Sequence, residues 1–393
     1  MKQINLIAIG IAVSLFFYSC STERELENEN SQNSKSSLSS RSSEVCEVFN
    51  NATESSVIPG IKAVYIDNGI STTCSNNILI FPTLQSYEDA ITILDNQIDD
   101  YNDGFDQQTA NMTDEEADDY ADEIGFNEDY PLIKFEEELN FCSLRQNIET
   151  LEEDWLSQQG DGAWNLDTDP DSHYIDDETE RALLNVGSEF IVGNCKDGYT
   201  YYKIFEWGTV EIEINDISSL SNILIAINNI INPTMTQVDD ILAASDTLHK
   251  IDVGPAYNNI PTFPNDCKEA AKEKGEKIFG NDRRIKWKNK FVRKSGVGSS
   301  PSIKGKALTK SYRKKKGKWK KFRATITAGL DGIVYNNCSN TVSFADSKEK
   351  RRKRLKLTKQ IGDPGNYQLH KLKPNKLISV HKQEGNYFQD DIY

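Results

Sequence analysis

Lysines alternate with apolar residues in two segments of the last third of the chain, "RRIKWKNKFVRKS" (283–295) and "PSIKGKALTKSYRKKKGKWKKFRATITAG" (301–329). Successive side chains of a strand point to opposite faces, so each segment predicts a strand with one lysine-rich face. Ammonium groups with interleaved aromatic rings suit phosphates, uronates or sulfates through charge and stacking. The residues predicted to contact such a polyanion are Lys286, Lys288, Lys290, Lys304, Lys306, Lys310, Trp319 and Lys320.

Two other interpretations of this lysine-rich face stay open. The face could be solvated, serving solubility alone, or it could dock against acidic residues of the same chain. For the polyanion interpretation, the partner classes are an anionic glycan, lipopolysaccharide or extracellular DNA, and a protein partner is the other candidate. The sequence does not choose among them.

A second group of candidates is acidic. In "DTDPDSHYIDDE", four carboxylates stand at positions 1, 3, 5 and 12 of a calcium-loop template, which suits a hard cation. The template requires glycine at position 6, where this chain has Ser172, and Pro170 also interrupts it. An acidic turn capping the helix "DETERALLN" is therefore favoured over calcium, and no other cofactor is expected. The weak calcium candidates are Asp167, Asp169, Asp171 and Glu178.

Enzyme signatures are missing from the sequence. It contains no G-x-S-x-G elbow, no phosphate-binding glycine loop and no H-E-x-x-H or C-x2-C metal spacing. Acidic residues are so frequent that a catalytic carboxylate pair could be proposed almost anywhere. No catalytic residue is predicted, although an extracytoplasmic hydrolase with a carboxylate site in the acidic part remains an alternative.

Charge divides the chain into two predicted domains. Residues 266–393 hold about 34 of the 45 Lys and Arg, although the whole chain has a formal charge of -16. Two prolines punctuate "IPTFPNDC" near the change of sign. We therefore predict an acidic region, residues 45–260, followed by a basic region, residues 266–393.

The acidic region has the pattern of an α+β domain. Residues 77–98 predict a buried strand followed by a helix capped by Ser86, and Thr113 with Glu116 forms a capping box. A single long helix is predicted from Pro131 to Gly160. Residues 188–214 predict a hairpin around "KDG", and residues 216–232 a closing helix.

The basic region has the pattern of an antiparallel, sandwich-like all-β domain. Its helix signals end with "DCKEAAKEKGEKIFG", and period-two segments follow. A turn is expected at Gly317, after which the alternation predicts a buried face. The residues of that face are Phe322, Ala324, Ile326 and Ala328.

The N-terminal residues have the layout of an export signal. Residues 1–19 carry one lysine and an apolar run too short to span a membrane, followed by Cys20. This arrangement resembles the lipobox of bacterial lipoproteins, which implies lipidation at Cys20. Residues 20–44 are rich in Ser, Asn and Glu and predict a disordered tether. The expectation is an outer-membrane lipoprotein exposed at the cell surface and anchored in that membrane by its lipid.

Six cysteines remain once Cys20 is set aside, and an exported chain with an even number is compatible with disulfides. Pairing is not fixed by the sequence. Bridges within each domain are preferred, with Cys267 to Cys338 first. The disulfide candidates are Cys46, Cys74, Cys142, Cys195, Cys267 and Cys338.

Two segments of the acidic region, "ILIFPTLQSYEDAITIL" and "DPDSHYIDDETERALLNVGSEFIVGN", resemble segments of uncharacterised Bacteroidota cell-surface lipoproteins. The resemblance covers about residues 75–205 and implies compartment and lineage, but no activity. Together these patterns predict a non-enzymatic, surface-anchored binding module whose basic region contacts a polyanion or a protein. A structural component of a surface complex, with its two domains docked by charge, is the further alternative.

Overall fold

The computed structural model describes residues 43–72, 74–245, 250–253, 271–294, 302–336, 340–361 and 370–391. Residues from Arg41 to Tyr393 belong to one compact unit. The domain boundary predicted near residues 260–267, the export signal, Cys20 and most of the tether lie outside the described residues.

The acidic region is built on a seven-stranded sheet in which neighbours along the chain are neighbours in space. All strand pairs are antiparallel except β3 with β4, which are parallel and are separated in sequence by five helices and two short 3-10 turns. The strands are β1 (Thr53–Glu54), β2 (Lys62–Tyr65), β3 (Asn77–Phe81), β4 (Glu189–Asn194), β5 (Gly198–Phe205), β6 (Gly208–Glu213) and β7 (Lys250–Val253).

Helices pack on both faces of this sheet. The helices are α2 (Leu84–Gln108), α3 (Asp114–Ile124), α4 (Tyr130–Glu138), α5 (Leu144–Ser157), α6 (Glu178–Ala182), α7 (Ile217–Asn228) and α8 (Met235–Ala243), with a further helix at residues 43–50 and 3-10 turns η1 (Leu166–Thr168) and η2 (Pro170–Ser172).

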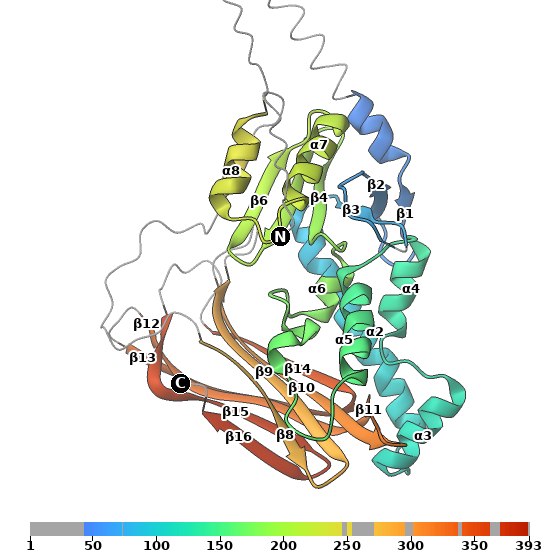
Figure 1. The fold of residues 1–393 in the computed structure, drawn as a ribbon, viewed down its shortest axis with the longest axis vertical. Coiled ribbons are helices and arrows are strands. Elements are labelled where there is room, and N and C mark those ends of the chain that lie inside the picture. The colour runs from blue at the N-terminus through green and yellow to red at the C-terminus, as the bar shows by residue number, and fades with distance from the viewer. Residues whose placement is uncertain are drawn as a thin grey trace, which may run out of the picture. The chain divides into compact units, whose positions relative to one another are not determined.

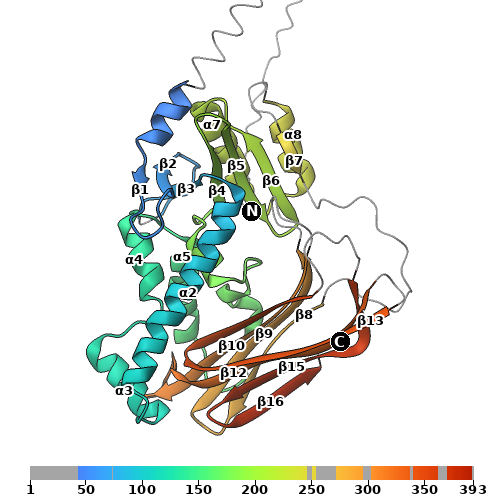
Figure 2. The same ribbon diagram turned by 180° about the vertical axis from the view of Figure 1, so that it is seen from behind.

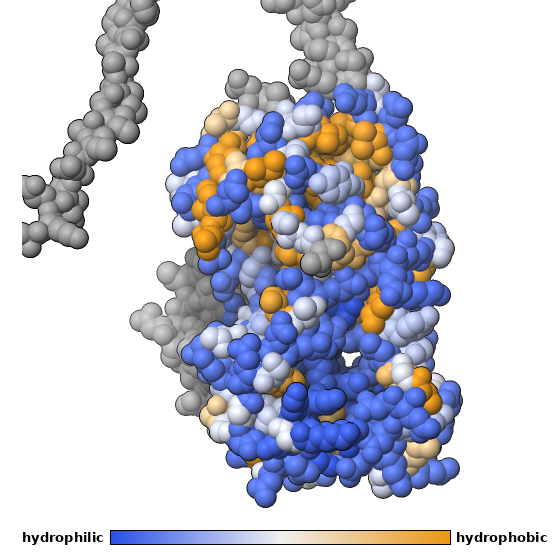
Figure 3. All heavy atoms as spheres, turned by 45° about the vertical axis from the view of Figure 1, so that its right-hand side comes forward, coloured by the Kyte–Doolittle hydropathy of each residue, from blue (hydrophilic) through white to orange (hydrophobic). Residues whose placement is uncertain are grey.

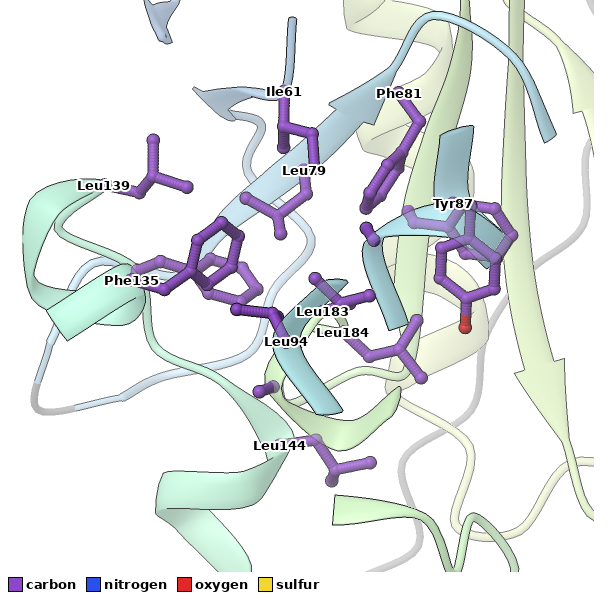
Figure 4. Close-up of a cluster of buried hydrophobic side chains, with 14 of the residues drawn as sticks. Ile61, Leu79, Phe81, Tyr87, Leu94, Phe135, Leu139, Leu144, Leu183 and Leu184 are labelled. Carbon is purple, nitrogen blue, oxygen red and sulfur yellow. The ribbon is translucent and has the colours of Figure 1, made fainter. Parts of the chain in front are cut away.

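Strand β3 shows how the two faces arise from its sequence. Leu79 and Phe81 pack into a core with α2, α4, α5 and α6, which Figure 4 shows in close-up. Ile78 and Ile80 point the other way, into a core with α7 and α8. Because alternate residues of a strand face opposite sides, a strand covered on both faces needs consecutive apolar residues, and β3 has four of them, residues 78–81.

Local signals in this region were predicted with mixed success. The capping box of Thr113 and Glu116 is confirmed at the start of α3, as is the hairpin formed by β4 and β5. The cap of α2 was assigned wrongly: Thr83, not Ser86, accepts the backbone N–H of Ser86. The single helix predicted from Pro131 to Gly160 is two helices, because the chain takes a positive φ at Asn140 and Ser143 caps a new helix.

The basic region consists of two antiparallel sheets, which confirms the coarse prediction of α+β followed by all-β. One sheet has the order β11-β10-β9-β8, with β14 also paired to β10, and the other has the order β13-β12-β15-β16. The strands are β8 (Ala271–Phe279), β9 (Arg283–Lys294), β10 (Ser302–Lys315), β11 (Lys318–Lys321), β12 (Ala324–Asn336), β13 (Asn340–Arg352), β14 (Arg354–Ile361), β15 (His370–Gln383) and β16 (Asn386–Asp391).

A shared core lies between the two sheets. Phe322, Ala324, Ile326 and Ala328 are all fully buried in it, as the alternation predicted. The expected turn at Gly317 is present, with positive φ at Lys316 and Gly317. Residues 271–279, read as the end of a helical signal, form strand β8 instead, because they pair along their whole length with β9.

The helices of the acidic region reach down beside the first of these sheets. Figures 1 and 2 show α2, α3 and α5 beside the part of this sheet that contains β10, β11 and β14. Helix α5 contacts β11, and α3 contacts β12. The lysine-rich face of the sheet therefore meets the acidic part of its own chain.

Candidate functional site at the lysine-rich face

Two buried lysines and two buried carboxylates form the centre of this contact. Lys286 Nζ lies 2.7 Å from Glu152 Oε1, and Lys310 Nζ lies 3.2 Å from Glu152 Oε2 and 3.0 Å from Asp171 Oδ2. The hydroxyl of Tyr312 donates to Glu152 as well, at 3.1 Å. Each of these four charged side chains is at most 5% exposed.

These charges stabilise one another against burial. Burial alone disfavours the ionised form of Glu152 and Asp171, but the ammonium groups of Lys286 and Lys310 outweigh it and hold the pKa of both carboxyl groups well below the usual range. For Lys286, burial again acts against the charge, and Glu152 outweighs it, so its pKa lies well above the ordinary value. Glu152, Asp171 and Lys286 are therefore ionised at neutral pH.

Further lysines of the face pair with a second acidic segment. Asp176 lies 3.1 Å from Lys306 Nζ and 3.4 Å from Lys290 Nζ, and Asp177 lies 2.7 Å from Lys356 Nζ. Burial opposes the charge on Asp176, yet the neighbouring lysines lower the pKa of its carboxyl group. The loop that begins α6 thus closes over the middle of the sheet.

Arginines of the basic region form further ion pairs with carboxylates of α2 and α3. Arg323, which is fully buried, pairs with Glu128 at 2.5 Å and Asp106 at 2.7 Å. Arg313 pairs with Asp118 at 2.6 Å and with Asp119 at 2.5 Å. Planar guanidinium groups suit such multiple carboxylate contacts.

Aromatic rings fill one end of the same contact. Trp155 and Trp164 come from the acidic region and pack with Tyr312 and Trp319 of the basic region in one buried cluster. The guanidinium of Arg284 lies over the rings of Trp164 and Trp319, at 4.2 and 4.6 Å from their centroids. The contact between the regions is therefore apolar as well as ionic.

The eight residues predicted to contact a polyanion lie in different environments. Lys286, Lys290, Lys306 and Lys310 are paired with carboxylates of the acidic region, and Lys288 donates to backbone carbonyls. Trp319 is buried among other aromatic rings, and Lys304 is half-buried. Lys320 is exposed on the β10–β11 hairpin.

The four calcium candidates do not converge. Asp167 is 96% exposed and lies 3.8 Å from Lys274, Asp169 pairs with Lys286, and Asp171 pairs with Lys310. Glu178 pairs with Arg354. Lysines or arginines thus pair with all four carboxylates, and Asp169 and Asp171 share Lys286. Calcium binding by these residues stays a prediction. Within the described part of the chain, the acidic group close enough to share an ion is Asp118, Asp119 and Asp122, and Arg313 and Lys315 already pair with it.

Carboxylates inside the acidic region also have structural partners. Glu189 is fully buried and accepts hydrogen bonds from Asn68 at 2.6 Å, Asn185 at 2.8 Å and Lys203 at 3.0 Å. Burial opposes its ionisation, but Lys203 and the amide donors lower the pKa of Glu189. A carboxylate held in this way connects the segments that carry Asn68, Asn185 and Lys203, which is a structural role.

Two polar cavities remain between the regions. Their volumes are about 490 and 630 Å³, and both are lined by Glu128, Asp129, Glu178 and Arg354. Figure 3 shows a hydrophilic surface over this part of the molecule, with a small opening in it. Both signs of charge line these cavities, so neither is a plain anion site.

Sequence reasoning found the lysines of the contact but not their partners. Glu152, Asp176 and Asp177 had no signal beyond the general excess of acid. The partner of a lysine that lies more than 100 residues away cannot be read from local periodicity. Only the sum of charges, strongly negative in one region and positive in the other, pointed to pairing.

Two disulfides lie in the acidic region, Cys46–Cys195 and Cys74–Cys142. The preference for bridges within one region holds for both. The other predicted pair, Cys267 and Cys338, lies outside the described residues. Among the residues that the structure describes, no helix is both long and apolar enough to cross a membrane.

Comparison with known proteins adds little to this description. No protein-family model matches the chain, and no curated protein matches it. A crystal structure of a DUF4848 family protein from Bacteroides thetaiotaomicron is similar over 82% of this chain and 95% of that chain, with 12% sequence identity and a TM-score of 0.17. A TM-score this low carries no argument about fold or function.

Proposed function

We propose that the protein is a non-enzymatic binding protein, anchored at the cell surface through Cys20, whose sandwich-like basic region contacts anions with a small part of its charge. Most lysines of the predicted face are occupied by carboxylates of the same chain. The contact with an external polyanion is assigned to the β10–β11 hairpin, at Lys316, Lys318 and Lys320, called here the hairpin lysines.

One observation supports this assignment. The hairpin lysines are exposed, and no described carboxylate lies within 4.0 Å of their ammonium groups, whereas Lys314, Lys315 and Lys321 around them are paired. Lys318 and Lys320 also line the larger cavity together with Lys353. Exposed cations without a fixed partner are the ones that can exchange counterions for a polyanion.

Binding of the full chain to immobilised heparin at low salt tests the proposal. Substitution of the three hairpin lysines by Gln is expected to lower the salt concentration at which the protein elutes, because fewer counterions are released on binding. The matched control replaces Lys134, Lys196 and Lys272 by Gln, which removes the same charge from other exposed positions. Equal elution of both triple variants, or no retention of the unaltered chain, would refute the assignment.

The ion pairs of Lys286 and Lys310 favour a second function. A charged face that is buried inside its own chain suits a structural component of a surface complex, in which the two regions are held as one body. On this alternative the unaltered chain passes through heparin unretained. The protein would then co-purify with fixed stoichiometry with other envelope components after mild cross-linking of intact cells.

A further inference from the structure

A third cavity lies at the other side of the lysine-rich face. Its volume is about 230 Å³, and its lining includes His173, Asp176, Lys288 and Lys290, with Glu206 and Glu273 among its exposed members. The cavity is smaller than those that hold drug-sized ligands, so it fits a molecule of a few heavy atoms. The ion pairs between the acidic and basic regions do not assign a function to this cavity, and the hairpin lysines do not line it.

Lys288 differs from its neighbours on β9 in the partners of its amine. Its Nζ donates to the backbone carbonyls of Asp171, at 3.0 Å, and His173, at 3.3 Å. Lys286 and Lys290, two positions to either side, are each paired with a carboxylate. Among the described residues, no carboxylate lies within 4.0 Å of the Lys288 ammonium, so its charge lacks a direct counterion.

The surroundings of this amine favour its neutral form. Burial lowers the pKa of Lys288 to about 8, and the positive charges of Arg181 and Lys310 act in the same direction. Asp171 and Asp176 oppose the shift without cancelling it. A neutral amine carries the lone pair that makes lysine a nucleophile, and burial is the usual means of producing one.

The ring of His173 supplies a hydrogen-bond donor at the same cavity. Its Nδ1 accepts the backbone N–H of Ile175 at 3.1 Å. Burial lowers the pKa of His173 to about 4, so the ring is neutral at pH 7 and its proton is on Nε2. A neutral ring of this tautomer can donate to a carbonyl oxygen without adding positive charge next to Lys288.

We infer that this cavity binds a small carbonyl compound, an aldehyde or a 2-oxo acid, as a reversible imine on Lys288. The amine nitrogen attacks the carbonyl carbon, and a proton moves from nitrogen to the carbonyl oxygen to give a carbinolamine. Loss of that oxygen as water leaves a C=N bond to Nζ, and hydrolysis reverses the step. The carboxylates of Glu206 and Glu273 at the cavity are suited to carry protons to and from solvent.

Reductive trapping with glyoxylate tests this inference. The full chain is treated with limiting glyoxylate and cyanoborohydride at several pH values, and modified lysines are located by peptide mass spectrometry. We expect Lys288 to be modified at least tenfold faster than Lys316, Lys318 and Lys320, with a rate that rises to a plateau through pH 8. The comparison is made within one unaltered molecule, so it does not depend on a variant that folds.

Two variants sharpen the result. Lys288→Arg should abolish the fast modification, whereas Lys290→Arg, at the same cavity, should leave it at Lys288. Modification spread evenly over the exposed lysines would overturn the inference. So would a Lys288 rate that keeps rising above pH 9, because that is the behaviour of an unperturbed amine.

Discussion

Lys286 Nζ lies 2.7 Å from Glu152 Oε1, although the two residues are 134 positions apart in the sequence. Glu152 comes from α5 of the acidic region, and Lys286 from β9 of the basic region. Both side chains are almost completely buried. The acidic and basic regions of the chain thus form ion pairs with each other. Each buried charge is stabilised by its partner instead of by water.

Glu152→Gln should destabilise the protein strongly. The amide cannot neutralise Lys286 and Lys310. Both ammonium groups would stay buried, with only the carboxylates of Asp169 and Asp171 as counterions. Loss of one partner from a buried ion pair typically costs about 3–5 kcal/mol. The free energy of unfolding, measured by denaturant titration followed by circular dichroism, checks this.

Glu153→Gln is the matched control for that change. Glu153 is the next residue on α5, is exposed, and has no ion pair among the described residues. The same substitution there should change the free energy of unfolding by less than about 0.5 kcal/mol. Similar losses in the two variants would contradict a special role for Glu152.

Stability should fall when the pH drops from 6.5 to 5. Burial lowers the pKa of His381 to about 3 and that of His173 to about 4. In the unfolded chain a histidine takes up its proton near pH 6.5, so below that pH the unfolded state binds more protons than the folded state. Each histidine should contribute a loss that approaches at most about 1.4 kcal/mol per pH unit toward pH 5, and well above pH 6.5 the two should have little effect on stability.

His381→Gln isolates one of the two contributions. His381 is held by Thr309 at 2.7 Å and by Asn289 at 3.3 Å between the two sheets, where no carboxylate of the described residues pairs with its ring. The variant should be less stable at pH 7, yet its slope between pH 6.5 and 5 should be shallower. Denaturant titrations at four pH values measure this slope, and an unchanged slope would count against the assignment to His381.

Gly275→Ala should destabilise the basic region. A Cβ at this position would lie 2.4 Å from the ring of Trp287, which is buried against β8. Forcing a methyl group into a packed site typically costs about 1–3 kcal/mol. Gly162→Ala is the control, since a Cβ there would meet nothing within 4 Å. Thermal unfolding of both variants gives the comparison.

Removing the Cys46–Cys195 bridge should cost more than removing Cys74–Cys142. The first closes a loop with a sequence separation of 149 residues and the second one of 68. Each double Cys→Ser variant should lose about 2–5 kcal/mol, and the loop lengths alone predict a difference of roughly 0.7 kcal/mol. Unfolding titrations of the two variants test the order, and a larger loss for the shorter loop would contradict the chain-entropy explanation.

Much of the local structure could be predicted because its causes are local. Thr113 and Glu116 cap α3 as their spacing indicates, and the alternation from Phe322 to Ala328 matches the buried face of the basic region. The predictions failed where a distant contact overrides a local preference. Residues 271–279 have a helical composition but pair with β9, where Gly275 leaves room for Trp287.

The sequence by itself determined that this chain has an acidic and a basic region, that the first is α+β and the second antiparallel β, and that its lysines share a face. These properties follow from composition and from the two-residue period of a strand. Only the tertiary structure decided what that face meets, because an ion pair depends on distance in space and Glu152, Asp171 and Asp176 are more than 100 residues from the lysines they neutralise. In the same packing, Lys288 and the hairpin lysines have no carboxylate within 4.0 Å among the described residues. The alternating lysines of the sequence did not distinguish these positions from the paired ones.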